Sequence, residues 1–287
     1  MKMHLDCPGC FVRQAIRTGR LLRCPDLVMW ELVKGCGTVL SQLEHEFPPP
    51  QNAVLLYDMI SLRIGNADPF YQLKKDSTRQ ALTLYPELKE KIKASNDSLD
   101  AALRFAACGN VIDYGVSSSF DLMKEIEEAF KTKFFHYEYE EFIAKLHQAD
   151  WVLYIGDNCG ESVFDKLLIE ELGKPVKYAV RSGPIINDVT EEDAIDAGID
   201  QVAEIVSTGC RAPGIVFDWC SDEFKTLYNS APLIISKGQG NFETLSDEKK
   251  EIFFIFKIKC KVVAKFLNSP LNSMFFGRTD TVILEHN

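Results

Sequence analysis

The sequence has no apolar run long enough to span a lipid bilayer. Its longest apolar stretch, at residues 253–266, is broken by lysines and falls short of the ~20 residues that a membrane helix needs. No apolar segment follows the first basic residues, so no secretory signal peptide is expected. We therefore expect a cytoplasmic protein without a membrane partner.

Basic residues are also scarce. Lys and Arg number 32 against 42 Asp and Glu, which gives a formal net charge of −10 over 287 residues. Nucleic-acid binding needs a basic surface, so no nucleic-acid partner is expected. No G-x-G-x-x-G loop follows a predicted strand and no G-x-x-x-x-G-K-[ST] motif occurs, so the usual nucleotide-binding loops are missing. The sequence does not determine the oligomeric state.

Nine cysteines without a secretory signal predict reduced thiols rather than a disulfide framework. Cys7 and Cys10 have the spacing of a zinc-binding pair but lack a second paired motif. His4, Cys24 or Cys36 would have to complete four ligands. A pair of reduced thiols at the start of a helix is the alternative, so Cys7 and Cys10 are kept as a candidate second metal site.

The two halves of the chain have different patterns. Apolar residues recur at helical spacing up to about residue 108, as in 99–106, where Asp97 or Ser98 is a candidate cap. A helix-rich stretch at 77–93 is expected to be split by Pro86. The pattern predicts an all-α domain at residues 1–108 and an α/β domain at residues 109–287.

From about residue 142, short apolar runs alternate with helical segments. The predicted strands cover residues 151–155, 176–180, 203–207, 233–236, 252–257 and 281–285. The predicted helices cover residues 162–172, 191–196, 221–228, 242–250 and 261–267. This alternation predicts a mainly parallel sheet covered by helices on both faces, a three-layer α/β/α Rossmann-like domain.

Polar and glycine-rich loops follow four of these strands, where an open α/β sheet binds its ligands. Asp157, Asn158 and Asp188 offer hard oxygen donors of the kind that Mg²⁺ or Mn²⁺ prefers, and Lys237 can pair with a phosphate. Each also has a simpler interpretation. Asn158 and Glu161 have the spacing of a capping box, Asp188 suits a turn, and Lys237 suits a solvated loop. Only their joint placement at one sheet edge favours a functional site.

Four ordered blocks of sequence resemble one known family. The motif GDNCGE at 156–161, followed by Phe164 and Asp165, resembles the signature of the damage-control phosphatase family, long labelled domain of unknown function 89. The other matching blocks are GNVIDYG at 109–115, GPIINDVT at 183–190 and SKGQGNFE at 236–243. The CPGC motif at 7–10 resembles the branch related to archaeal proteins and to phosphatase domains fused to pantothenate kinase.

The resemblance implies a metal-dependent phosphatase that hydrolyses phosphate monoesters of small metabolites in metabolite damage control. The implied substrates are sugar phosphates or phosphopantetheine-like compounds, and the implied cofactor is divalent Mg, Mn, Co or Ni. The implied catalytic residues are Asp157, Asn158, Asp188 and Lys237, the first three as metal ligands and Lys237 as the phosphate-binding lysine. The implied further substrate contacts are Asn110, Glu161, Ser207 and Gly209.

Several alternatives stay open. Phosphorus could be attacked by water or by the Asp157 carboxylate. A non-catalytic metal- or nucleotide-binding α/β protein is one alternative function. A small-molecule methyltransferase is another, although it would need a glycine-rich cofactor loop where residues 156–158 stand. A specificity pocket is expected between the helical domain and the sheet edge, with contributions from Phe70, Tyr71 and Tyr114.

Overall fold

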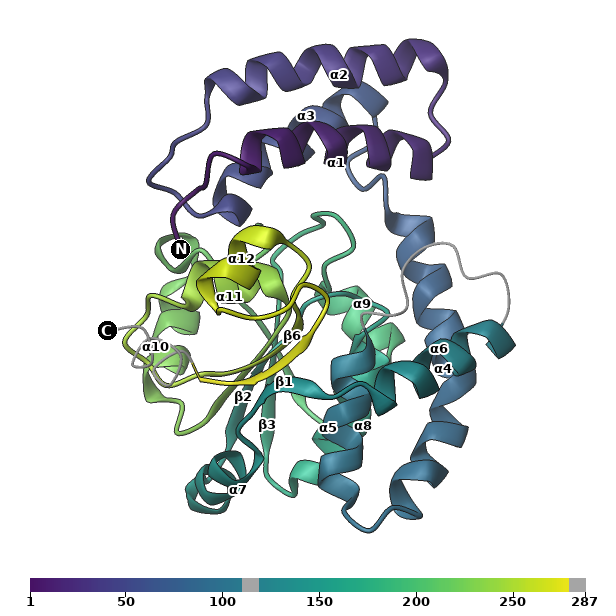
Figure 1. Ribbon diagram of the computed structural model, residues 1–287, viewed down its shortest axis with the longest axis vertical. Coiled ribbons are helices and arrows are strands. Elements are labelled where there is room, and N and C mark those ends of the chain that lie inside the picture. Colours follow the sequence, from purple (N-terminus) through teal and green to yellow (C-terminus); the bar gives the residue numbers. More distant parts are fainter. Residues whose placement is uncertain (110–118, 279–287) are drawn as a thin grey trace.

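The computed structural model describes residues 1–109 and 119–278 (Figure 1). Within those residues, seven strands form one sheet in the order β1-β7-β6-β5-β2-β3-β4. The strands are β1 (Phe134–Tyr137), β2 (Val152–Ile155), β3 (Val176–Val180), β4 (Glu204–Ser207), β5 (Ile234–Lys237), β6 (Phe253–Lys257) and β7 (Met274–Gly277). Only β6 and β7 pair antiparallel, so the predicted, mainly parallel α/β sheet is confirmed.

The sheet is buried on both faces because both sets of alternating side chains are apolar. In β2, Val152 and Tyr154 face one core, whereas Leu153 and Ile155 face the other. The helices of the first core are α4 (Tyr71–Lys93), α5 (Ser98–Cys108), α6 (Ser119–Lys131), α7 (Tyr139–Gln148), α8 (Ser162–Leu172) and α9 (Glu191–Asp196). Those of the second core are α10 (Asp222–Ser230), α11 (Gln239–Leu245) and α12 (Lys261–Phe266).

Three further helices form a separate layer beyond one end of the sheet (Figure 1). They are α1 (Cys7–Leu21), α2 (Asp26–Ser41) and α3 (Pro49–Ile64), and they share a third apolar core. Ile185, from the loop after β3, is buried in that core. The loop that carries the predicted ligand Asp188 is therefore anchored in the helical layer.

The prediction that Pro86 splits a helix was wrong, because α4 runs unbroken through it. Proline removes one backbone N–H, which leaves the carbonyl oxygen of Leu82 without its helical partner. Leu82 is exposed, so water can satisfy that oxygen, while Ala81, Leu84 and Leu88 keep the opposite face in the core.

Most predicted elements occur within a residue or two of their expected positions, and Asp97 caps α5 through a bond from the Asp100 amide. The helix predicted at 242–250 is instead α11, which begins at Gln239 because the chain turns at Gly238, where φ is 86°. The pattern did not predict β1 or β7, and the strand predicted at 281–285 lies outside the described residues. The domain division at 108/109 stays a prediction, since α4 and α5 share the sheet's first core.

No helix in the described part of the chain combines the length and the apolar character that crossing a membrane requires.

Lys74 links α4 to α9 through a buried ion pair. Its ammonium lies 2.9 Å from both Asp193 and Asp68, and the Lys74–Asp193 pair is almost fully buried. We predict that Lys74→Met lowers the free energy of unfolding by roughly 3 kcal/mol, because it leaves buried carboxylate charge uncompensated. Lys75→Met is the matched control. Its partners Glu192 and Asp196 are largely exposed, so a loss of about 1 kcal/mol or less is expected in urea titrations. Equal losses for the two variants would contradict this assignment.

Candidate active site

The predicted site residues lie at a switch point in the sheet. β2 has β3 on one side and β5 on the other, and all three strands run parallel. The chain passes from β2 to β3 and β4 and then crosses back to β5. The loops after β2 and β5 therefore leave the same sheet edge in opposite directions, which opens a crevice for a ligand.

Backbone pairing brings Asp157, Asn158 and Asp188 together. Asn158 and Asp188 form an isolated antiparallel bridge, and the Val189 amide donates to the carbonyl of Asp157 at 2.8 Å. The Asn158 amide nitrogen donates to Asp157 Oδ2 at 3.0 Å and to Glu161 Oε1 at 2.6 Å. With its nitrogen engaged, Asn158 keeps its amide oxygen as a hard donor.

The predicted capping box at Asn158 and Glu161 is wrong, because Glu161 itself stands at the N-cap of α8 and its side chain makes no cap bond. Its carboxylate instead accepts from the amide nitrogen of Asn158 at 2.6 Å and from the ammonium of Lys237 at 3.3 Å. A capping box does occur at the start of α9, where Asp193 accepts from the amide of Thr190 at 3.1 Å.

Arg181 is the main functional candidate that the sequence did not single out. It follows β3 directly and is fully buried. Its Nε donates to Asp188 Oδ2 at 2.8 Å, and its Nη2 donates to Asn241 Oδ1 at 3.0 Å and lies 4.0 Å from Asp157 Oδ1. One guanidinium therefore spans the two predicted metal-ligating carboxylates. A charged residue at the end of an apolar strand was the available signal.

Asn241 and Gly238 fit the loop after β5 against the loop after β2. The Asn241 amide nitrogen donates to the carbonyls of Gly156 at 3.1 Å and Lys237 at 2.7 Å. A Cβ on Gly238 would lie 2.1 Å from the Asp157 carboxylate. Only glycine allows this approach together with the positive φ.

Lys237, the predicted phosphate-binding lysine, is the last residue of β5 and is fully buried. Its ammonium donates to Asp165 Oδ1 at 2.6 Å and to Glu161 Oε2 at 3.3 Å. Burial lowers its pKa, but the neighbouring carboxylates outweigh burial and raise the pKa above its ordinary value. Lys237 is therefore a permanent positive charge at the sheet edge.

The site carries more buried negative than positive charge. The four carboxylates of Asp157, Glu161, Asp165 and Asp188 face the two cations Arg181 and Lys237. Burial raises the pKa of Asp157 well above its usual range and that of Asp188 to about 6, although Arg181 opposes both shifts. Two carboxylates whose charged forms burial disfavours, beside an amide oxygen, fit a divalent cation, which would stabilise those charged forms. In the described residues no three His, Cys, Asp or Glu side chains are arranged to hold a metal, so the Asn158 amide would have to contribute.

The other predicted site residues either lie away from these carboxylates or fall outside the residues that the structure describes. Ser207 is exposed and accepts from the Gly209 amide at 3.2 Å, and neither residue has a described bond to the carboxylates. Asn110 lies outside the described residues. Cys7 is half-buried at the start of α1 and Cys10 is exposed, and among the described residues neither belongs to a set of three His, Cys, Asp or Glu side chains arranged to hold a metal.

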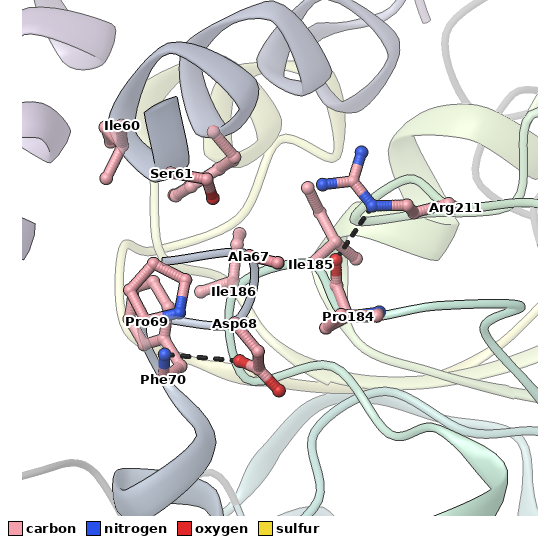
Figure 2. Close-up of a pocket in the computed structure, with 11 residues that line it drawn as sticks. Ile60, Ser61, Ala67, Asp68, Pro69, Phe70, Pro184, Ile185, Ile186 and Arg211 are labelled. Carbon is pink, nitrogen blue, oxygen red and sulfur yellow. Dashed lines mark hydrogen bonds between the residues drawn. The ribbon is translucent and has the colours of Figure 1, made fainter. Parts of the chain in front are cut away.

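A small cavity lies between the helical layer and the loop before Asp188 (Figure 2). Its empty volume is about 240 Å³, including open solvent at its mouth. Ser61 and Phe70 line it from the helical side, and Pro184 and Ile186 line it from the sheet edge. Arg211 closes one side and donates to the carbonyl of Pro184 at 2.9 Å. Of the three aromatics expected in a specificity pocket, Phe70 lines this cavity, Tyr71 is largely exposed, and Tyr114 lies outside the described residues.

The raised pKa of Asp188 predicts a pH-dependent stability. Because its folded pKa of about 6 exceeds an unfolded value of ~3.9, its stabilising contribution is complete below about pH 4 and is lost as the pH rises through 6. We predict that, without metal, wild type loses on the order of 2–3 kcal/mol relative to Asp188→Asn between pH 4 and pH 7. Urea unfolding at each pH measures this, with the exposed Asp200→Asn as control. A difference that does not vary with pH would contradict it.

Comparison with known proteins identifies the family of this chain. The model of the damage-control phosphatase ARMT1-like domain matches residues 3–274. The damage-control phosphatase PH1575 of Pyrococcus horikoshii is 34% identical over 281 residues, which are 96% of this chain and 97% of the relative. A damage-control phosphatase of Archaeoglobus fulgidus is 30% identical over 285 residues, or 96% and 98% of the two chains. The crystal structure of a DUF89 family protein from P. horikoshii superposes with a TM-score of 0.89 at 32% identity, covering 97% of this chain and 99% of that one. The chain therefore belongs to the damage-control phosphatase ARMT1-like (DUF89) family.

Proposed function

We propose that this protein is a cytoplasmic, divalent-metal-dependent phosphatase that hydrolyses phosphate monoesters of small metabolites in metabolite damage control. Family membership supports phosphate hydrolysis, since the relatives from P. horikoshii and A. fulgidus carry the name damage-control phosphatase. One observation carries the proposal: Asp157, Asn158, Asp188 and Lys237 converge at the ends of three adjacent parallel strands.

The proposed metal ligands are Asp157, Asn158 and Asp188. Their two carboxylates and one amide oxygen suit Mg²⁺, Mn²⁺, Co²⁺ or Ni²⁺. A cation there would supply positive charge that polarises a phosphoryl oxygen. The protein's own contribution is orientation: Arg181 fixes the Asp188 carboxylate at 2.8 Å, and Asn241 fixes Arg181.

The phosphoryl group is proposed to lie beside Lys237, whose charge offsets that of the phosphate. The N-terminus of α8 adds the partial positive charge of a helix dipole at the same edge. Phosphoryl transfer depends mainly on positioning and on stabilising charge, and buried, hydrogen-bonded groups provide both. The organic part of the substrate is proposed to extend toward the cavity between the helical layer and residues 184–186 (Figure 2).

The test is hydrolysis of an aryl phosphate by chelator-treated protein, with and without Mn²⁺, Co²⁺, Ni²⁺ or Mg²⁺. We predict metal-stimulated turnover by wild type and a loss of at least about 10²-fold in kcat for Asp157→Ala. The loss is expected because Asp157 is both a proposed ligand and a partner of Asn158. Asp200→Ala removes an exposed aspartate and should leave kcat unchanged.

Circular dichroism and thermal unfolding would establish that Asp157→Ala still folds. Full metal-stimulated activity in that folded variant would exclude the proposed site. Absence of metal-stimulated hydrolysis by wild type would exclude the proposed function.

A further inference from the structure

We propose that Asp165, held by the hydroxyls of Tyr154 and Tyr178, is a positioning residue that fixes the Lys237 ammonium for phosphate binding. The inference rests on the proposed phosphatase function and assigns roles to three side chains beneath the site.

Asp165 is the closest described partner of Lys237. It lies in the first turns of α8, and neither side chain is exposed to solvent. The Nζ–Oδ1 distance of 2.6 Å is that of a short, charge-assisted hydrogen bond. The ammonium is thereby held at the end of β5 from the direction of α8.

Two tyrosines fix the Asp165 carboxylate in turn. The Tyr154 hydroxyl donates to Oδ1 at 2.7 Å, and the Tyr178 hydroxyl donates to Oδ2 at 2.8 Å. Tyr154 and Tyr178 are partners across β2 and β3, and their rings stack at 5.5 Å. Both carboxylate oxygens are therefore bonded from a rigid sheet, which leaves the carboxylate one orientation.

Folding stability alone does not explain this buried polar network. It buries a carboxylate, an ammonium and two hydroxyls, and well-packed apolar side chains in their place are often as stabilising or more so. What it does provide is a fixed location for one positive charge. That is the property a phosphate-binding group needs.

Lys237 also has capacity for a ligand. An ammonium has three N–H donors, and within the described residues it has two acceptors, Asp165 and the more distant Glu161 at 3.3 Å. One donor thus remains for a phosphate oxygen, and Asp165 determines where it points.

The test compares three variants with wild type. Asp165→Asn keeps the shape but removes the charge, and Tyr154→Phe/Tyr178→Phe removes both hydroxyls but keeps the ion pair. The matched control is Asp193→Asn, since Asp193 is also a buried aspartate bonded to a buried lysine and to a hydroxyl, those of Lys74 and Thr190. Steady-state kinetics with an aryl phosphate give kcat and KM, calorimetry gives the Kd of inorganic phosphate, and electron paramagnetic resonance gives the Kd of Mn²⁺.

We expect Asp165→Asn to raise both KM and the phosphate Kd by about tenfold or more, equivalent to ~1.4 kcal/mol, while the Mn²⁺ Kd changes less than twofold. The double tyrosine variant should also raise KM and the phosphate Kd with little change in the Mn²⁺ Kd, but by a smaller factor. Asp193→Asn should change stability but neither constant. A purely structural role would instead weaken phosphate and Mn²⁺ binding together, in proportion to lost stability.

Unchanged KM and phosphate Kd in folded Asp165→Asn would overturn the inference, as would parallel loss of phosphate and Mn²⁺ binding. If wild type hydrolyses no phosphate monoester, the proposed function fails, yet the phosphate Kd values still test Asp165. Failure of wild type to bind phosphate overturns the inference as well.

Discussion

The arrangement of this molecule depends on an excess of negative charge buried at one end of a parallel sheet. Four carboxylates are held there against two cations, and burying an uncompensated charge costs far more than a surface charge does. The fold tolerates the imbalance because Arg181 spans two of the aspartates and Lys237 contacts the other two carboxylates. The fully charged form of this site is energetically unfavourable until a cation or a proton binds. That is the electrostatic reason for regarding it as functional.

The surrounding backbone explains how the charges stay together. Asn241 ties Arg181 to the carbonyls of Gly156 and Lys237, so that the loops after β2, β3 and β5 are bonded through one amide. On the loop after β3, Ile186 adopts a positive φ of 45°, an unfavourable conformation for a β-branched residue. Strain of this kind persists only where surrounding packing enforces it, and it is common at functional sites.

The sequence predicted the parallel sheet and the strand-end loops because short apolar runs and glycine-rich turns are local signals. It also predicted that Asp157, Asn158, Asp188 and Lys237 lie together at one sheet edge, as they do, because loops that follow parallel strands leave the same edge. It did not identify the roles of Arg181 or Asp165, because nothing local distinguishes a buried charge from a solvated one. The edge strand β1 was missed for a related reason, since its residues are only partly buried and its pairing with β7 is long-range. The likeness of Asn158 and Glu161 to a capping box shows the converse, a local pattern overridden by tertiary contacts.

The burial of Ile185 bears on the order in which the chain can fold. The helices α1, α2 and α3 are synthesised before the sheet, yet the core they share is completed by a side chain synthesised much later, from the loop after β3. During synthesis that core stays open, and contacts between distant segments form slowly. The nascent helical layer therefore exposes the apolar surface that Ile185 covers until the loop after β3 has been synthesised.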